Sequence, residues 1–225
     1  MDKMLYLPEL YLDMPNAYYY GCEDGEISLK DFESFTRNPL NKFRSFELID
    51  GRLVLMAGNA SSNHQRIVSE MTIDIGIYLR KQRKKCKVFN DLNLYLFNEE
   101  FGKCINRFQP DIMICCDETK ITKKGYEGVP GLVVEVISKS TSDYDYGRKL
   151  DNYIKYGVQE YWIVDMFENK IYVHLNTDKE NLVINEYTFY DKAESVIFPG
   201  MSIDFNIILE DLDKSELKWF KGDTN

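Results

Sequence analysis

Two short apolar runs in the middle of the chain each carry one carboxylate where an apolar residue would fit better. Residues 107–116 include Asp111, and residues 132–138 include Glu135. Both runs are rich in Ile, Met, Val and Leu and are bounded by turn residues, a pattern that is typical of strands. A charge in such a strand is costly unless it is paired or bound to a cation. The pattern therefore predicts two central strands and a functional site where their carboxylates lie.

A β-hairpin is predicted over residues 43–56. Apolar stretches lie on both sides of the dipeptide Asp50-Gly51, which is a strong signal for a two-residue hairpin turn. Glu47 alternates with apolar neighbours, so its side chain should point to the face opposite theirs. The sequence does not indicate which of the two faces is the core.

A long helix is predicted from Ser61 or Ser62, either of which could cap it, to about Lys84. Apolar residues recur along it at helical spacing and form one face: Ile67, Val68, Met71, Ile75, Tyr78 and Leu79. A basic run, residues 80–87, falls on the last turns, where cations suit the helix dipole. The same run could contact DNA, although runs of charge are more often solvated surface.

A strand, a helix and a second strand are predicted after Glu135. The first strand is the run that ends at Ser138, the helix ends at Gly157, and the second strand covers residues 158–165. The candidate helix caps are Thr141, Ser142 and Asp143. Strands joined by such a helix are typically parallel neighbours.

The other predicted elements lie at the edges of this unit. They are a strand over residues 87–97, a short helix over 28–36 capped by Ser28, an antiparallel hairpin of 170–175 and 182–190, and a helix after Asp204 with Ile207, Ile208 and Leu212 on one face.

The composition is that of a globular protein with an acidic surface. The chain has 225 residues, of which 44% are hydrophobic, enough for a sizeable core. A formal net charge of −9 excludes a large basic surface overall. No stretch is long and apolar enough to span a membrane, and the N-terminus lacks the pattern of a signal peptide. We therefore expect a cytoplasmic protein.

Histidine and cysteine usage narrows the chemistry further. His64 and His174 are the only histidines, which excludes a site that needs three of them. The five cysteines are odd in number and show no CxxC spacing. We therefore expect reduced thiols, and neither a disulfide framework nor a zinc site.

The two carboxylates of the central strands could meet. The interval between Asp111 and Glu135 contains three glycines and a proline, so it can turn back and place the strands side by side. At a separation of about 4 Å, their repulsion is roughly 4 kcal/mol at an effective dielectric constant of about 20. A divalent cation would offset this repulsion, because Mg²⁺ is typically held by one or two carboxylates, water and phosphate. The other reading is that one carboxylate caps a strand end or pairs with Arg107.

Several motifs appear in a characteristic order along the chain. They are Phe46-Glu-Leu-Ile-Asp-Gly, His64 at a helix start, Pro110-Asp111, Val134-Glu-Val-Ile-Ser, Ser140-Thr141, Asp145, Lys149, Tyr153, Gly157-Val158 and Glu160-Tyr-Trp. This ordered set covers about residues 43–200 and resembles the Uma-two family of endonucleases, a branch of the PD-(D/E)XK restriction-endonuclease-like superfamily.

The resemblance implies an α/β fold. Its restriction-endonuclease-like core would be a mixed central β-sheet flanked by helices, with the β-hairpin region as an addition. We expect residues 1–40 to form an N-terminal extension packed on the core, and residues 41–225 to form the restriction-endonuclease-like domain.

The resemblance also implies a metal site and an activity. Carried over by position, Asp111 and Glu135 would bind Mg²⁺ or Mn²⁺. Val136 could add its backbone carbonyl, and Glu47 could complete the acidic cluster. The metal would lower the pKa of a bound water and stabilise charge on the scissile phosphate, which makes the implied activity metal-dependent hydrolysis of DNA phosphodiester bonds. For Glu47, the other reading is an ion pair with a nearby Arg or Lys.

The lysine of the superfamily motif is displaced in this chain. The motif expects it two residues after the glutamate, where this sequence has Ile137. Lys139 and Lys149 are the candidate replacements, and the resemblance favours Lys149, which would orient the water and stabilise the pentacovalent phosphate. The other reading is an i, i+4 ion pair between Lys149 and Asp145, and both readings could hold at once.

Three further residues are candidate contacts to phosphate or substrate: His64, Gln65 and Tyr153. A lone histidine near a helix start is more often a cap or a surface group, and the other two are as readily surface or packing residues. Trp162 is expected to pack rather than to stack on a base, and Asp165 is expected to cap a strand end.

The partner that the resemblance implies is DNA, and no membrane is expected. The chain could form a homodimer. A competing function is a non-catalytic restriction-endonuclease-like scaffold that binds protein or nucleic acid. The acidic balance and the displaced lysine favour the scaffold, and the carboxylate pair favours the enzyme. A third reading is a hydrolase of another phosphodiester, such as RNA or a small nucleotide.

Overall fold

The structure is a computed structural model that describes residues 18–20, 27–41, 44–56, 60–98, 103–138, 145–178 and 181–220. The helices are α1 (Leu29–Thr36), α2 (Ser62–Lys81), α4 (Leu150–Lys155) and α5 (Phe205–Glu210), with a π-helical turn at Asp145–Lys149 and 3₁₀ turns at Pro39–Asn41, Glu118–Lys120 and Lys214–Glu216. The strands are β1 (Tyr18–Tyr20), β2 (Ser45–Ile49), β3 (Arg52–Met56), β4 (Lys87–Asn90), β5 (Leu94–Asn98), β6 (Lys103–Phe108), β7 (Ile112–Cys115), β8 (Leu132–Val136), β9 (Glu160–Asp165), β10 (Lys170–Asp178), β11 (Asn181–Tyr187), β12 (Lys192–Glu194) and β13 (Ser202–Asp204).

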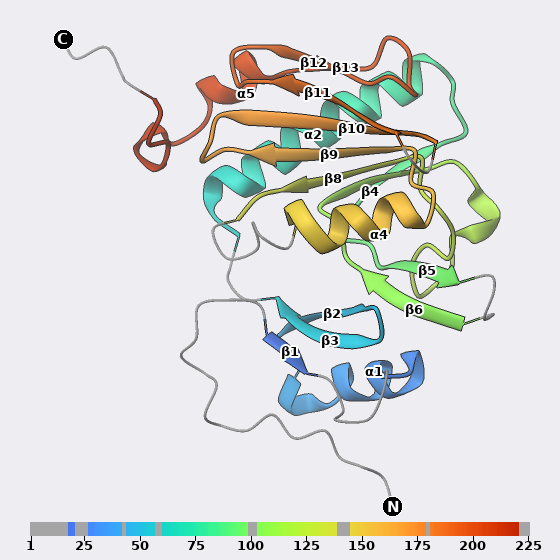
Figure 1. Cartoon of the computed structure of the whole chain (residues 1–225). Coiled ribbons are helices and arrows are strands. Elements are labelled where there is room, and N and C mark those ends of the chain that lie inside the picture. The colour runs from blue at the N-terminus through green and yellow to red at the C-terminus, as the bar shows by residue number, and fades with distance from the viewer. Residues whose placement is uncertain are drawn as a thin grey trace, which may run out of the picture.

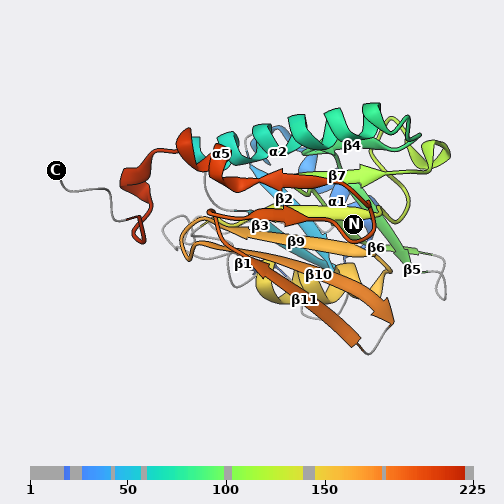
Figure 2. The same ribbon diagram turned by 90° about the horizontal axis from the view of Figure 1, so that it is seen from above.

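A six-stranded sheet forms the centre of the molecule. Its strand order is β11-β10-β9-β8-β7-β4, and β8 and β9 are parallel whereas the other neighbours are antiparallel. Helix α2 crosses one face of this sheet and α4 lies on the other (Figure 1), an arrangement that is also visible from above (Figure 2). A second sheet, with the order β1-β3-β2-β6-β5, lies below it in Figure 1. The predicted mixed central sheet flanked by helices is confirmed.

Alternation along β8 separates two hydrophobic cores. Leu132, Val134 and Val136 pack in the core that contains α2, α5 and the β12–β13 pair. Val133 points into the second core, between the six-stranded sheet, α4 and the second sheet. Because side chains on a strand alternate between faces, Glu135 points toward the second core as well. The carboxylate of β8 is therefore directed at α4 rather than at α2.

Most predicted elements are present. The hairpin forms as β2 and β3 around the Asp50-Gly51 turn, β10 and β11 are antiparallel, and the strands on either side of α4 are parallel. Ser28 caps α1, and Ser61 caps α2 by accepting a hydrogen bond from the His64 amide. The candidate caps at 141–143 lie outside the described residues, and the division of the chain at residue 40 stays a prediction.

Two predicted strands are each divided between the two sheets. The run 87–97 forms β4 in the central sheet and β5 in the second sheet. Asp91, in the left-handed region with φ 49°, makes the turn between them. The run 107–116 likewise forms the end of β6 and then β7. Its break lies at residues 109–111, so Asp111 precedes β7 instead of lying within it.

The buried face of α5 differs from the predicted one. Ile207 is 61% exposed, whereas Ile208, Leu209 and Leu212 are buried. Because α5 begins at Phe205, which is buried, its i+4 neighbour Leu209 takes the inward position and Ile207 faces away.

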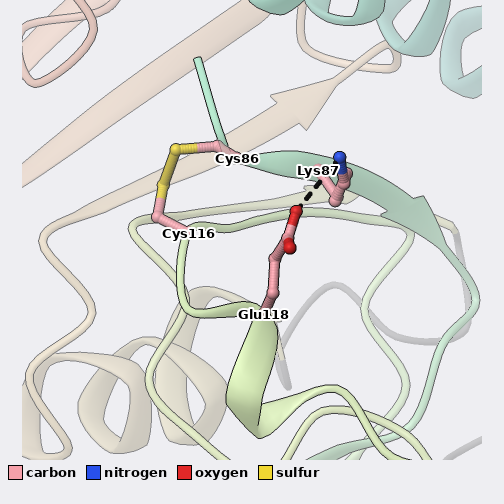
Figure 3. The surroundings of a disulfide bond; sticks show 4 residues. All are labelled: Cys86, Lys87, Cys116 and Glu118. Carbon is pink, nitrogen blue, oxygen red and sulfur yellow. Dashed lines mark ion pairs between the residues drawn. A yellow bond between two sulfur atoms is a disulfide. The ribbon is translucent and has the colours of Figure 1, made fainter.

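The prediction of reduced thiols is wrong for two of the five cysteines. Cys86 and Cys116 form a disulfide (Figure 3). Their strands β4 and β7 are antiparallel, with Lys87 opposite Cys115, so the next residues outward face each other at the strand ends. The sequence hides this pairing because the two residues are 30 positions apart. Cys115 is a buried free cysteine, and burial raises the pKa of its thiol to about 12.

Loss of this disulfide should destabilise the fold. We expect the double variant Cys86→Ser, Cys116→Ser to have a free energy of unfolding about 3 kcal/mol lower than that of the oxidised protein. The reason is that the bond closes a loop of about 30 residues in the unfolded chain. Urea denaturation with and without a reducing agent measures this. Identical midpoints for the oxidised, reduced and double-serine proteins would contradict the bond.

Candidate active site

Asp111 and Glu135 lie opposite each other at one end of the β7–β8 pair. Ile112 pairs with Val134, so the next antiparallel pair outward is Asp111 with Glu135. Asp111 Oδ2 also accepts a hydrogen bond from the Val136 amide at 2.7 Å. The predicted side-by-side strands are thus present, and Asp111 caps a strand end at the same time. Arg107 is engaged elsewhere, because its guanidinium donates to the Phe46 carbonyl at 2.5 Å and to the Asn93 side chain.

Lys149 joins this pair from the π-helical turn before α4. Its Nζ lies 3.0 Å from Glu135 Oε1, 3.1 Å from Asp145 Oδ1 and 3.7 Å from Glu47 Oε2. The lysine is 2% exposed. Burial alone would lower the pKa of Lys149, but the surrounding carboxylates outweigh burial and raise that pKa well above its usual value. The ammonium is therefore charged, and the i, i+4 pair with Asp145 is one of its three ion pairs.

Glu47 reaches the cluster from the second sheet. It is buried on β2, on the face opposite Phe46 and Leu48, which pack with α1 in a third small core. Its Oε1 accepts a hydrogen bond from the Gln109 amide at 2.8 Å, and its Oε2 faces Lys149. Glu47 therefore links the hairpin to the loop that carries Asp111.

Tyr153 fixes the orientation of Glu135. Its hydroxyl donates to Glu135 Oε1 at 2.8 Å, and its side chain is fully buried. Burial raises the pKa of Glu135 well above the usual value, and nearby carboxylates add to the rise while Lys149 opposes it. Glu135 Oε2 has no hydrogen-bond partner within the described ranges, so that oxygen can take a further ligand.

His64 contacts Asp111 from the first turn of α2. Its Nε2 lies 3.2 Å from Asp111 Oδ2, and the residue is buried. Burial lowers the pKa of His64, but the hydrogen bond to Asp111, its charge and a hydrogen bond with the Val136 backbone together raise the pKa above 6.5. The histidine thus lies against the carboxylate instead of facing solvent.

The other predicted site residues lie apart from this cluster or outside the described residues. Gln65 is exposed on α2, and Lys139 lies outside the described residues. Trp162 is buried in the core and donates to Glu160. Asp165 accepts two amide hydrogen bonds at the end of β9, as expected of a cap.

A buried amide network at the site was not predicted. Asn106 Oδ1 accepts from the Asp50 amide at 2.7 Å, and Asn106 Nδ2 donates to Asn152 Oδ1 at 3.1 Å. Asn152 Nδ2 in turn donates to Asp50 Oδ2 at 3.2 Å. The network ties α4 to the hairpin turn, and so holds Lys149 against Glu47. The sequence carries no clear signal for it, because Asn106 lies in β6 beside Arg107 and not in an apolar run.

The donor atoms present suit a small divalent cation. Four carboxylates, those of Glu47, Asp111, Glu135 and Asp145, face one ammonium and one imidazole, so the cluster keeps an excess of negative charge. Within the described ranges, no group of three or more His, Cys, Asp or Glu side chains could hold a metal by itself. Mg²⁺ typically uses one or two carboxylates and completes its shell with water and phosphate. The carboxylates of Asp111 and Glu135 are therefore ligands of the kind that Mg²⁺ or Mn²⁺ takes.

The second histidine of the chain lies in a different environment. His174 on β10 is 6% exposed and stacks on Tyr161 with ring centroids 6.0 Å apart. Neither ring nitrogen has a hydrogen-bond partner in the part of the chain that the structure describes. Burial lowers the pKa of His174 to about 4, so the ring is neutral in the folded protein at neutral pH.

Acid should therefore weaken the fold through His174. Because its folded pKa lies below the unfolded value of 6.5, the unfolded state binds the extra proton, and stability is lost as the pH falls from about 6.5 to about 4. We expect this residue to contribute a loss of about 2 kcal/mol over that window. Urea denaturation at several pH values measures this effect. In His174→Phe, which keeps the aromatic contact, the free energy of unfolding should fall less steeply with decreasing pH than in the wild type. Equal slopes in the two proteins would contradict the contribution of His174.

Inside the described part of the chain, the helices are too short or too polar to cross a bilayer.

Comparison with known proteins adds a family and a fold. Residues 30–206 match the family model Uma2, described as "Putative restriction endonuclease". Two Synechocystis proteins are similar: "Uncharacterized protein sll1609", 29% identical over 124 residues, and "Uncharacterized protein slr1290", 30% identical over 169 residues. The first match covers 54% of this chain and 66% of the relative, just under two thirds of its length, and the second covers 74% and 84%.

A solved structure has the same fold. It is described as a "putative nuclease belonging to DUF820" from Anabaena variabilis, with a TM-score of 0.63 and 16% identity over 82% of this chain and 98% of that one. The similarity confirms the expected restriction-endonuclease-like arrangement of sheet and helices.

Proposed function

Because the chain belongs to the Uma2 family, we propose that it is a metal-dependent endonuclease that hydrolyses DNA phosphodiester bonds. The family description and the nuclease with the same fold support a nuclease, whose substrate is a nucleic acid. One observation supports the finer proposal: Asp111, just before β7, lies in the register position opposite Glu135 of β8, and the Lys149 ammonium lies 3.0 Å from Glu135 Oε1.

The proposed metal ligands are Asp111, Glu135 and the Val136 carbonyl, with Glu47 completing the acidic cluster. When bound, Mg²⁺ or Mn²⁺ supplies Lewis acidity to the scissile phosphate and lowers the pKa of a coordinated water. Asp111 has 17% of its side chain exposed, whereas the side chains of Lys149 and Glu135 are 3% and 5% exposed. A phosphate would therefore approach from the Asp111 side.

The remaining residues of the cluster would position the water and the metal ligands and stabilise charge on the phosphate. Lys149 would orient the attacking water and stabilise the charge that develops on the phosphate. Tyr153 would hold Glu135 in place, and His64 would hold Asp111. Gln65, exposed one residue after His64, is the proposed phosphate contact. Lys139 stays the alternative to Lys149 as the catalytic lysine.

Removal of the metal tests this function directly. With Mg²⁺ or Mn²⁺, the purified protein should convert supercoiled plasmid DNA to the nicked form, and excess EDTA should stop the reaction. Adding Mn²⁺ back should restore it. Nicking by metal-free protein would remove the proposed metal dependence, and the lack of nicking with every divalent cation tried would remove the endonuclease.

A second candidate function is a non-catalytic scaffold that binds protein or nucleic acid. The closed ion pair of Lys149 with Glu135, both nearly inaccessible to solvent, favours it, because such a pair can simply stabilise the fold. Titration calorimetry with Mn²⁺ separates the two functions. A scaffold without a metal site would show no heat that depends on Asp111.

A further inference from the structure

The basic run at the C-terminal end of α2 has no acidic partners over most of its length. Arg80, Lys81, Arg83, Lys84 and Lys85 are all exposed. None of them forms an ion pair within the described ranges, although the chain carries a net charge of −9. At the other end of α2, by contrast, Arg66 pairs with Glu70 and Asp211. The five residues Arg80, Lys81, Arg83, Lys84 and Lys85 are called the basic end of α2 below.

The helix dipole explains only part of this run. Arg80 and Lys81 lie in the last turn of α2, where cations are favourable. Arg83, Lys84 and Lys85 follow after the helix has ended, and the effect of the dipole falls off within the last turn. A reason other than helix stability is needed for these three charges.

Arg83 occupies a backbone position that favours glycine. Its φ is 50°, in the left-handed region. The Lys84 amide donates to the Leu79 carbonyl and the Arg83 amide donates to the Arg80 carbonyl, both at 3.1 Å, which is the hydrogen-bond pattern of a Schellman cap. An arginine there costs about 1 kcal/mol relative to glycine. The fold alone would therefore be better served by glycine, and the guanidinium points to a role outside the fold.

The backbone next to the basic end of α2 is anchored. Cys86 follows it directly and is bonded to Cys116, and Lys87 pairs with Glu118 at 3.2 Å (Figure 3). The Lys84 ammonium lies over the Phe198 ring, 5.9 Å from its centroid. Cations on an anchored backbone lose less conformational entropy when they bind a polyanion than cations on a flexible tail do.

We propose that the basic end of α2 binds the phosphate backbone of duplex DNA outside the active site. The inference rests on the proposed endonuclease function, which makes DNA the polyanion. Arg80 lies sixteen positions after His64 on α2, which corresponds to about 24 Å along the helix. One strand of B-DNA advances 3.4 Å per phosphate, so this spans about seven base pairs. The contact thus adds affinity and leaves the chemistry at Asp111 unchanged.

A charge-matched pair of variants tests the surface. The first replaces Arg83, Lys84 and Lys85 with glutamine. The control replaces three exposed lysines on other elements with glutamine: Lys155, Lys192 and Lys218. Both remove three positive charges from the same protein. Fluorescence anisotropy with a labelled duplex, in EDTA, reports binding independently of cleavage.

The expected result is specific to the basic end of α2. The first variant should bind the duplex about tenfold more weakly at low salt, and the slope of log K against log salt should become shallower by about 2 to 3, since each phosphate contact contributes about 0.9. The affinity of the control variant for the duplex should stay within about twofold of the wild-type affinity. Equal affinities and slopes for the first variant and the control would overturn the proposal.

Arg83→Gly separates binding from folding. Glycine relieves the left-handed strain, so the melting temperature should stay the same or rise, while DNA affinity falls. Unchanged DNA affinity in Arg83→Gly would count against the proposal. A loss of binding to anionic lipid vesicles by the triple glutamine variant, with DNA binding intact, would assign the surface to a membrane instead and overturn the proposal.

The two proposals fail in different ways. If neither wild type nor variant nicks DNA but the triple variant binds it more weakly than the control does, the endonuclease is lost and the DNA surface stands. If the wild type nicks DNA and the triple variant binds as well as the control, only the DNA surface is lost.

Discussion

Replacing Asp111 with asparagine should reduce metal-dependent nicking by about 10³-fold, because the metal and its electrostatic stabilisation of the phosphate contribute several kcal/mol. Asparagine has the same shape and can still accept the hydrogen bond that the Val136 amide donates to Asp111 Oδ2. It removes one of the two carboxylate charges that the proposed cation needs. The fold should therefore be retained while nicking falls.

Nicking rates and Mn²⁺ calorimetry on the same preparations measure this effect. Asp151→Asn is the matched control, because Asp151 is exposed on α4 and makes no contact with Asp111 or Glu135 within the described residues. The control should keep its activity and its heat of Mn²⁺ binding. If Asp111→Asn cleaved DNA at the rate of the control, the proposed metal site would be wrong.

The Lys149→Met variant should be strongly destabilised. Methionine fills a similar volume but removes the ammonium that, in the described part of the chain, pairs with Glu47, Glu135 and Asp145. Removing one partner of a buried ion pair typically costs about 3–5 kcal/mol, because charge is left buried without compensation. Lys155→Met, on the exposed side of α4, is the control and should lose little stability.

The pH dependence of this loss identifies its cause. Without Lys149, the buried carboxylates can be neutralised only by protons, so their folded pKa values should lie above the unfolded ones. Such groups destabilise the fold at high pH and regain stability as the pH falls through the folded pKa. Urea denaturation in EDTA should therefore show that the difference in unfolding free energy between Lys149→Met and the wild type narrows from about pH 8 to about pH 5. A difference that is constant with pH would point to packing instead of charge.

The positions of the charged residues were the most predictable part of the site. Asp111 and Glu135 stand out because an apolar strand rarely carries a charge, and strand alternation placed Glu47 opposite its apolar neighbours. Lys149 was favoured by the resemblance, and the structure places it between Glu135 and Asp145. The catalytic roles of these residues stay predictions.

Contacts that depend on long-range pairing could not be predicted. Asn106 and Asn152 are buried together only because two sheets and α4 meet. The same arrangement divides the run 87–97 between two sheets, a division that turn residues near Asp91 indicate only weakly. The Cys86–Cys116 bond follows from the pairing of β4 with β7, and cysteine spacing says nothing of strand pairing.

Cys115 is the neighbour of Cys116 in the chain, and its side chain lies in the core between the central sheet and α4. Adjacent residues of a strand point to opposite faces, so its sulfur is directed away from Cys116. Exchange requires a thiolate that can reach a disulfide sulfur, and a thiol with a pKa of about 12 is almost fully protonated at neutral pH. The neighbouring thiol is thus a poor internal nucleophile, and scrambling of the bond would have to begin with unfolding or with a thiol from outside.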